Sequence, residues 1–345
     1  MTLRDVAQRT GVSVTTISKV LNGGGDVSPQ TRALVEEQLD RSGYRRRLPQ
    51  VSTGYLQVVV PNLSGDWVFG IVAGIQEAAA RAGHGISLVV NDDRESDDPA
   101  WVDEALRRNA TAVVVLLDAV PKEAHARLRA AGIPFVLIDP AGDPIPDVPA
   151  VSAANWSGGL EAARHLLGLG HRKIAAVTGP ATSLPAIARV DGFRAALTSA
   201  GETVREDWVR FGDFTAESGE REARELLAHD DPPTAIFAGS DMQAVGVLDA
   251  AAAAGISVPR ELSVVGFDDV TLAGYVRPRL TTVRQPLSEM AAQATKTVLE
   301  LAHHPTLERP RIELSTRLVV RESTAPPWSR TSSKPLPSPA VNGNT

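Results

Sequence analysis

Polar side chains able to hydrogen-bond a phosphate or a base edge gather in one short stretch near the start of the chain. Hydroxyl, ammonium and amide groups occur there at Ser13, Thr15, Thr16, Ser18, Lys19 and Asn22. Apolar residues alternate with them at helical spacing, at Val14, Ile17, Val20 and Leu21. This spacing predicts a helix that turns one apolar face inward and leaves the polar side chains outside. Such side chains are typical contacts to nucleic-acid phosphates and bases.

The charge distribution supports a polyanionic partner for this stretch alone. Residues 1–47 contain eight Lys and Arg but only five Asp and Glu, a net charge of +3, although the whole chain carries -6. Binding to phosphates needs local positive charge only, so a basic segment on an acidic body fits a nucleic-acid-binding module joined to another domain. On charge alone, a solvated pair of basic helices is the alternative.

Several other chemistries lack the residues they need. The chain has no cysteine, which excludes disulfides, thiolate zinc sites and a cysteine nucleophile. It also lacks a phosphate-binding Gly-x-x-x-x-Gly-Lys-Ser/Thr loop, a Gly-x-Ser-x-Gly elbow and a His-Glu-x-x-His pair. We interpret the adjacent His303 and His304 as a surface feature. We therefore expect no enzyme, no metal site and no cofactor.

Three short helices are predicted to position the polar stretch. The first starts at a capping box, Thr2 to Asp5, and ends near Gly11, where glycine tolerates the backbone conformation of a helix end. Ser13 can cap the second helix, and Ser28 followed by Pro29 begins a third that ends near residue 43. Two helices joined by a glycine-containing turn, with a third closing the core, form a helix-turn-helix, whose second helix enters the major groove of DNA.

The same segments resemble the N-terminal signature of the LacI/GalR family of transcriptional regulators. The resemblance lies in residues 2–7, 11–13, 16–22 and 27–32. It implies that Val14, Thr15 and Lys19 lie nearest the base edges of an operator duplex. By the same resemblance, Ser13, Thr16, Ser18 and Asn22 hold phosphates. Lys19 can donate to the O6 and N7 acceptors of guanine, and Val14 can pack on a thymine methyl.

Residues 46–54 are predicted to link this head, residues 1–45, to the rest of the chain. Family members usually form a small hinge helix here that wedges a leucine into the minor groove, but this linker is shorter. Leu48 followed by Pro49 can still supply such a wedge. The arginines at 45–47 can enter a narrow minor groove or meet phosphates, and the sequence leaves both possibilities open.

Strand-like apolar runs alternate with helical stretches from Tyr55 onward. A first series has predicted strands at 56–60, 86–90, 112–117 and 135–138. Between them we predict one helix at 67–82, a second that ends at residue 109 and a third that ends at residue 131. A second series after Pro149 has helices at 156–169, 185–200, 216–228 and 241–254 and strands at 173–177, 208–211, 234–237 and 262–267. Alternation of this kind predicts parallel sheets covered by helices, here in two lobes with a ligand cleft between them. The fold class is therefore an all-α helix-turn-helix head plus a two-lobed α/β body over residues 55–323.

The family resemblance extends through this body, at residues 165–166, 170–174, 189–193, 237–241, 264–269 and 280–286. It implies an effector domain similar to periplasmic binding proteins, with chain crossovers that return to the first lobe. The cleft residues it implies are Asp139, Arg189, Phe214, Asp241, Asp268 and Gln285. Asp66, Trp67 and Trp156 are further candidates.

This set of side chains suits a sugar. Carboxylates and a guanidinium bind hydroxyls directionally, and an aromatic ring covers the apolar face of a pyranose. An oligosaccharide is an option if both tryptophans line the cleft. Core packing is the alternative role for Trp67 and Trp156, and capping of a loop is the alternative for Asp268.

The two ends of the chain bear on its location and assembly. Residues 324–345 are rich in Pro, Ser, Thr and Asn and are predicted to form a disordered tail. No apolar heptads precede it, so we expect a homodimer rather than a tetramer. The N-terminus lacks the features of a secretory signal, and no apolar run approaches the roughly 18 to 20 residues that span a bilayer. We therefore expect a cytoplasmic protein. An exported sugar-binding protein is the rival hypothesis, but it would need a signal peptide and no DNA-binding head.

Overall fold

The computed structural model describes residues 3–21, 27–41, 54–91, 100–116, 120–142, 145 and 147–328. The chain divides into two compact units, Met1–Thr53 and Gly54–Thr345. Asn22 and most of the predicted linker, residues 46–53, lie outside the described residues.

The first unit contains the three predicted helices: α1 (Leu3–Thr10), α2 (Val14–Leu21) and α3 (Pro29–Arg41). Their buried core consists of Val6, Ile17, Val20, Val35 and Leu39. The predicted caps of α2 and α3 are present, because Ser13 Oγ accepts the Thr16 N–H at 3.1 Å and Ser28 Oγ accepts the Thr31 N–H at 3.2 Å. Thr2, which begins the predicted capping box of α1, lies outside the described residues. One expectation is corrected: Val14 is 40% exposed and does not join the core.

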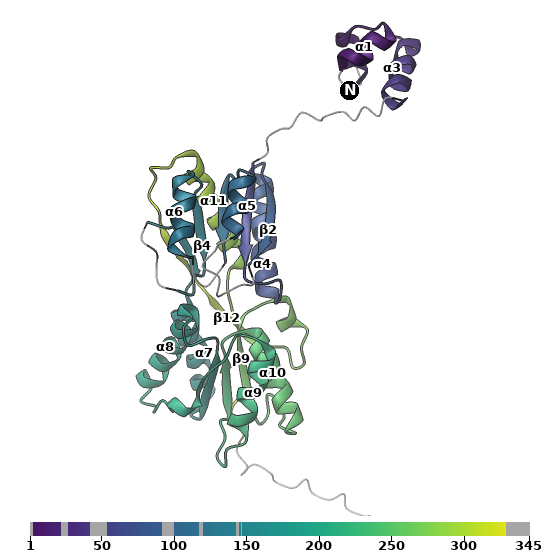
Figure 1. The fold of residues 1–345 in the computed structure, drawn as a ribbon. Coiled ribbons are helices and arrows are strands. Elements are labelled where there is room, and N and C mark those ends of the chain that lie inside the picture. Colours follow the sequence, from purple (N-terminus) through teal and green to yellow (C-terminus); the bar gives the residue numbers. More distant parts are fainter. Residues whose placement is uncertain are drawn as a thin grey trace, which may run out of the picture. The chain divides into compact units, whose positions relative to one another are not determined.

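The first lobe of the second unit has a six-stranded parallel sheet in the order β11-β5-β4-β3-β1-β2 (Figure 1). Its strands are β1 (Tyr55–Val60), β2 (Gly85–Val90), β3 (Ala112–Val115), β4 (Phe135–Ile138), β5 (Ala150–Ala153) and β11 (Arg311–Leu314). Helices α4 (Asp66–Arg81) and α11 (Leu287–His303) share one apolar core with the sheet. Helices α5 (Ala100–Arg107) and α6 (Lys122–Ala130) contribute to a second core.

The second lobe repeats this plan with the strand order β12-β10-β9-β8-β6-β7, in which only β12 is antiparallel to its neighbour. Its strands are β6 (Ile174–Thr178), β7 (Val209–Phe211), β8 (Ala235–Ala238), β9 (Ser263–Asp268), β10 (Thr281–Arg284) and β12 (Arg317–Val319). One core includes side chains of α7 (Asn155–Gly168) and α8 (Leu184–Ser199), and another includes those of α9 (Ala216–Leu227) and α10 (Asp241–Ala253). Two short 3-10 helices, η1 (Glu206–Trp208) and η2 (Thr271–Gly274), complete the lobe.

The predicted boundary between the lobes is wrong. Strand β5 follows Pro149 directly but pairs with β4, so the chain leaves the first lobe only after Ala153. The chain crosses back between β10 and α11, and once more between β11 and β12. We predicted neither β5 nor the strands after residue 280, because these strands are three or four residues long and carry little pattern. We also gave no bounds for helix α11, although it is 17 residues long. Trp208 belongs to η1 rather than to the predicted strand.

Glycines bring α7 and α8 into backbone contact. A Cβ atom on Gly192 would lie 1.9 Å from the Trp156 carbonyl oxygen, and one on Gly159 would lie 1.9 Å from the Arg189 carbonyl oxygen. No other residue type fits at this crossing, since real side chains never approach so closely. The crossing therefore sets the position of the backbone of Arg189.

The second lobe continues further along the chain than we expected. Residues 324–328, assigned to the tail from sequence, contact this lobe: the Ala325 N–H donates to Ser263 Oγ at 3.0 Å, and the Ala325 carbonyl lies 2.8 Å from His171 Nε2. The remainder of the predicted tail, residues 329–345, lies outside the described residues. Among the helices that the structure describes, none has the length and apolarity needed to cross a bilayer.

Candidate functional site

The outward face of α2 carries the residues predicted to meet DNA. Val14, Thr15 and Lys19 are exposed, whereas Ser18 is half-buried. Ser13 is the N-cap of the helix, and its Oγ lies 2.9 Å from Thr16 Oγ1. The structure therefore leaves the three predicted base-contacting residues at the surface, while two of the predicted phosphate contacts also serve the fold of the helix.

A cavity of about 210 Å³ lies between the two lobes, at the carboxyl ends of their strands. Six predicted effector residues line it: Asp66, Trp67, Asp139, Arg189, Phe214 and Asp268. The first three belong to the first lobe and the others to the second. We refer to this cavity as the cleft.

Arg189 is the central polar group of the cleft and is only 4% exposed. Its Nε donates to Asn155 Oδ1 at 2.8 Å, and its Nη1 donates to the Gly239 carbonyl oxygen. Its guanidinium carbon lies 4.0 Å from the centre of the Phe267 ring, within the range of a cation–π contact. These contacts fix the plane of the guanidinium before any ligand arrives.

Carboxylates from both lobes flank this guanidinium. Asp139 Oδ2 lies 3.8 Å from Arg189 Nη2, and Asp268 Oδ1 lies 3.7 Å from Arg189 Nη1. Burial raises the pKa of both carboxyls, although the nearby guanidinium opposes the shift, and the pKa of Asp268 reaches about 7. One buried cation thus faces two carboxyls that each resist ionisation.

Backbone strain is concentrated in the walls of the cleft. Asp139, Phe214 and Asp268 have φ angles of +46°, +67° and +110°, a region that residues other than glycine rarely adopt. Such strain often marks functional sites. Ser240, which the sequence did not single out for the cleft, supports Phe214: its Oγ donates to the Phe214 carbonyl at 3.0 Å while it caps α10.

Aromatic groups complete the cleft wall. The Phe214 ring centre lies 5.5 Å from the Arg189 guanidinium carbon. Trp67 is half-buried, and its Nε1 is a buried donor without a hydrogen-bond partner among the described residues. A buried donor of this kind is normally satisfied, so this nitrogen is an exception among the buried polar atoms of the cleft wall.

Three predicted effector residues do not line the cleft. Gln285 stands behind it and donates from Nε2 to Asp268 Oδ1 at 2.6 Å. Asp241 is fully buried and bonds to Thr282 and Val270. Trp156 lines a second cavity, of about 290 Å³.

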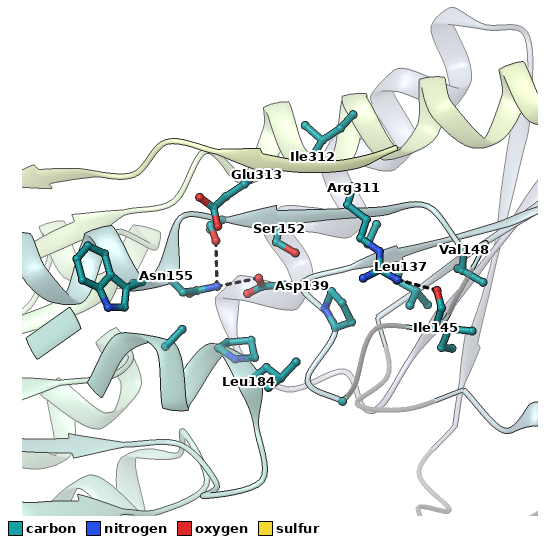
Figure 2. Close-up of a pocket in the computed structure, with 17 residues that line it drawn as sticks. Leu137, Asp139, Ile145, Val148, Ser152, Asn155, Leu184, Arg311, Ile312 and Glu313 are labelled. Atoms are coloured by element: carbon teal, nitrogen blue, oxygen red, sulfur yellow. Dashed lines mark hydrogen bonds between the residues drawn. The ribbon is translucent and has the colours of Figure 1, made fainter. Parts of the chain in front are cut away.

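The second cavity adjoins the cleft through Asp139. Figure 2 shows Asp139 and Asn155 joined by a hydrogen bond of 2.9 Å at one end of it, with Ser152, Glu313 and Arg311 along its wall. A backbone hydrogen bond between the lobes, from Leu184 N to Ala141 O at 2.7 Å, joins a residue that lines the second cavity to a residue that lines the cleft.

Sequence reasoning also missed Asn155, Ser183 and Ser240. A detectable signal existed only for Ser240, because Ser240 and Gln243 have the spacing of a capping box. Asn155 bonds to both Arg189 and Asp139, at 2.8 and 2.9 Å. It is the first residue of α7, where asparagine is common for structural reasons, so its type and position did not indicate a role in the cleft.

A helix-turn-helix head and a two-lobed body whose cleft contains buried charged groups define a class of protein: a DNA-binding regulator that responds to a small ligand. Comparison with known proteins makes this specific. Residues 2–47 match the model of bacterial regulatory proteins of the lacI family, and residues 163–324 match a periplasmic binding protein-like domain.

Relatives cover nearly the whole chain. Catabolite control protein A of Priestia megaterium is 31% identical over 330 residues, covering 94% of this chain and 99% of its own. Among solved structures, a complex of the transcriptional regulator CelR with cellobiose is 31% identical with a TM-score of 0.72, and a lac repressor dimer bound to operator and an anti-inducer is 26% identical with a TM-score of 0.76. Each of these two matches covers 94% of this chain and 99% of the solved chain.

The chain belongs to the lacI family of bacterial regulatory proteins. The resemblance and the fold class expected from sequence are confirmed. The protein is a DNA-binding transcriptional regulator with an effector-binding body.

Proposed function

We propose that this regulator is a homodimeric repressor of the cytoplasm, that a sugar or oligosaccharide bound in the cleft controls its affinity for an operator, and that it catalyses no reaction. One observation carries the proposal: Arg189 is buried and oriented between Asp139 of the first lobe and Asp268 of the second. A ligand that bonds to these groups contacts both lobes at once and therefore favours one angle between them.

The chemistry of the cleft favours a sugar over other small ligands. Neighbouring hydroxyls of a pyranose can accept from a guanidinium and donate to a carboxylate, which matches the alternation of Asp139, Arg189 and Asp268. Phe214 and Trp67 line the cleft and offer apolar surface for the apolar side of such a ligand. The relatives give further support, since solved structures include CelR with cellobiose and an Enterococcus faecium regulator with ribose.

The head supplies the DNA contacts in this proposal. The exposed Lys19 and Val14 are placed to reach a guanine edge and a thymine methyl, and Thr15 lies beside them. Ser13, Thr16, Ser18 and Asn22 are proposed to hold phosphates. A dimer would place two such helices in successive major grooves of a near-palindrome, as the operator-bound lac repressor dimer suggests.

Separate substitutions in the head and cleft test the division of labour. We expect Lys19→Ala to weaken binding to a duplex from upstream of the regulator's own gene about ten-fold, while cellobiose affinity stays unchanged. Arg189→Ala should abolish cellobiose binding and leave DNA affinity without sugar unchanged. Fluorescence anisotropy measures the first quantity and calorimetry the second, with maltose, ribose and glucose run beside cellobiose.

The competing explanation is a sugar-binding protein without a DNA role. It predicts no salt-sensitive preference for any duplex, and that result would remove the repressor proposal. Loss of both activities in either variant would contradict the separation of the two sites.

A further inference from the structure

The carboxyl group of Asp241 does not reach the cleft, so it has no direct contact with a ligand there. It is fully buried at the first turn of α10 and does not line the cleft, although Ser240 and Met242 on either side of it do. A buried carboxyl is costly unless its oxygens are satisfied. Its contacts therefore indicate what it does.

Both carboxyl oxygens of Asp241 are used, and each joins a different element. Oδ2 accepts the Val270 backbone N–H at 2.9 Å, and Oδ1 accepts the Thr282 hydroxyl at 2.5 Å. Room for the carboxyl depends on Gly266 of β9, where a Cβ atom would lie 2.4 Å from Oδ1. The group thus connects α10, β10 and the turn that follows β9.

That turn is strained, and it forms part of the cleft. Asp268 and Asp269 both have positive φ angles, +110° and +56°. Asp268 and Val270 line the cleft. Two consecutive residues of this kind do not stay in place unless their surroundings hold them.

Asp268 is held by Gln285, whose Nε2 donates to Asp268 Oδ1 at 2.6 Å and whose backbone N–H donates to the Asp268 carbonyl oxygen at 3.2 Å. Val270 is held by the carboxyl of Asp241. Asp269, between them, is held from the other side by Arg284 and Arg321. Each of the three residues of the turn is therefore held by a hydrogen bond. Asp241 holds Val270, which lines the cleft.

We propose that Asp241 is a positioning residue that holds the turn Asp268–Val270 in its strained form and so keeps the Asp268 carboxylate beside Arg189. The holding of the turn is a property of the chain itself. Only its consequence for sugar affinity rests on the proposed function.

The chemistry of Asp241 offers a matched pair of variants. Burial, and then the neighbouring Asp268 and Asp269, raise the pKa of Asp241, so the neutral acid is favoured. An amide has the same shape as the neutral acid. In Asp241→Asn the oxygen can still accept from Val270, and Nδ2 can donate to the Thr282 hydroxyl. Asp241→Ala loses both bonds.

Hydrogen exchange of the full chain without ligand tests the inference directly. We expect the Val270 amide, followed in the peptide 268–276 by mass spectrometry, to exchange about ten-fold faster in Asp241→Ala and at the wild-type rate in Asp241→Asn. Asp249→Ala, an exposed position on the same helix, is the control and should change nothing. If Asp241→Ala unfolds, Thr282→Val, which removes one of the two bonds, should still accelerate exchange in the folded protein.

The pH titration of Asp268 provides a readout that loss of stability alone would not change. Asp139, Arg189, Gln285 and the Asp241 backbone surround this carboxyl. The carbon-13 resonance of the Asp268 carboxyl follows its titration with pH. The pKa of Asp268 should remain near 7 in Asp241→Asn and fall in Asp241→Ala, because a released turn lets the carboxyl reach water.

Cellobiose titration then links the turn to the cleft. Affinity should fall about ten-fold in Asp241→Ala and be restored in Asp241→Asn. Equal losses in both variants would identify a direct role for the charge and overturn the inference, as would unchanged exchange in Asp241→Ala. If the wild type binds none of the sugars, the proposed function fails, while the exchange and titration results still decide the role of Asp241.

Discussion

Arg189 meets more negative charge than one guanidinium can balance. Asp139 and Asp268 approach it at 3.8 and 3.7 Å, and all three side chains are buried. Removing a carboxylate from water costs more than a single shared partner returns, so a neutral acid is favoured. The raised pKa of about 7 for Asp268 expresses this imbalance. A ligand with hydroxyl donors would relieve this imbalance, which favours binding of a sugar in the cleft.

Stability should therefore depend on pH through Asp268. An unfolded aspartate has a pKa near 3.9, so between about pH 4 and pH 7 the folded state holds a proton that the unfolded state releases. The contribution of this group to stability is thus lost as the pH rises through that window. Asp268→Asn cannot ionise, and it should gain on the wild type by at least about 1 kcal/mol, or roughly 2–4 °C, between pH 5 and pH 8.

Thermal denaturation of the two proteins across that pH range measures the difference. Asp249→Asn, which removes an exposed carboxylate, is the control and should run parallel to the wild type. A constant difference between Asp268→Asn and the wild type would mean that Asp268 ionises normally in the fold. The same variant should bind cellobiose more weakly, because it loses an acceptor beside Arg189.

At this scale the sequence predicted the chemistry of the site better than the direction of each side chain. Asp241 and Asp268 both follow a buried strand, yet only Asp268 reaches the cleft. The difference arises from the positive φ at Asp268, which no local pattern announces. Gln285 and Trp156 were placed in the cleft for similar reasons, but one stands behind Asp268 and the other lines the neighbouring cavity.

Between elements, the crossing of α7 and α8 determines where Arg189 stands. Both helices meet at glycines, and each glycine touches a carbonyl oxygen of the other helix. Asn155 at the start of α7 then reaches Arg189 on α8 at 2.8 Å. The geometry of the cleft is therefore sensitive to the separation of two helices that otherwise serve only the core.

Gly192→Ala should damage both the fold and the site. The added methyl would lie 1.9 Å from the Trp156 carbonyl, so the helices must separate, at a cost of about 1–3 kcal/mol. We expect a lower Tm together with weaker cellobiose binding, since Arg189 moves away from Asn155. Gly168→Ala, on α7 with nothing within 4 Å of the added atom, should be neutral or stabilise by up to about 1 kcal/mol.

Gly246→Ala separates the effect on the site from the effect on stability. Its methyl would lie 1.9 Å from the Ala216 carbonyl, at the corresponding crossing of α9 and α10. It should lower Tm without the same loss of cellobiose affinity at a temperature where both variants are folded. Equal losses in the two variants would show that the α7–α8 crossing has no special role.

Element prediction succeeded for most long helices and failed for the shortest strands, and α11, which has 17 residues but received no predicted bounds, is the exception. Long helices such as α8 and α10 were predicted within one or two residues of their observed bounds. Strand β5 has four residues, lies directly after Pro149 and shows no alternation, because both its faces are largely buried. In the first sheet it lies between β4 and β11, and β11 comes some 160 residues later, so a local pattern cannot report that second pairing.

In the body as a whole, the chain crosses between the lobes three times, and two kinds of non-covalent contact also join them. Side chains meet in the cleft through Arg189 and Asp139. Backbone meets backbone where Leu184, the first residue of α8, donates to the Ala141 carbonyl at 2.7 Å. In the proposed function the ligand bonds to the groups of the first contact, so removal of the second contact tests how strongly the lobes associate without ligand.

Leu184→Pro removes this backbone bond, and the proline Cδ takes the place of the N–H and pushes against the Ala141 carbonyl oxygen. Proline is well tolerated at the first position of a helix, and the preceding Ser183 is already extended, at φ -85° and ψ 118°, as a residue before proline must be. Leu184→Ala keeps the N–H and is the matched control. If closed lobes are the form that binds sugar, Leu184→Pro should weaken cellobiose binding by at least about two- to ten-fold relative to Leu184→Ala, because it loses one net hydrogen bond and its ring also repels the Ala141 carbonyl oxygen. Small-angle scattering should show a larger radius of gyration for the proline variant without sugar, and identical profiles for the two variants would mean that the bond does not hold the lobes closed.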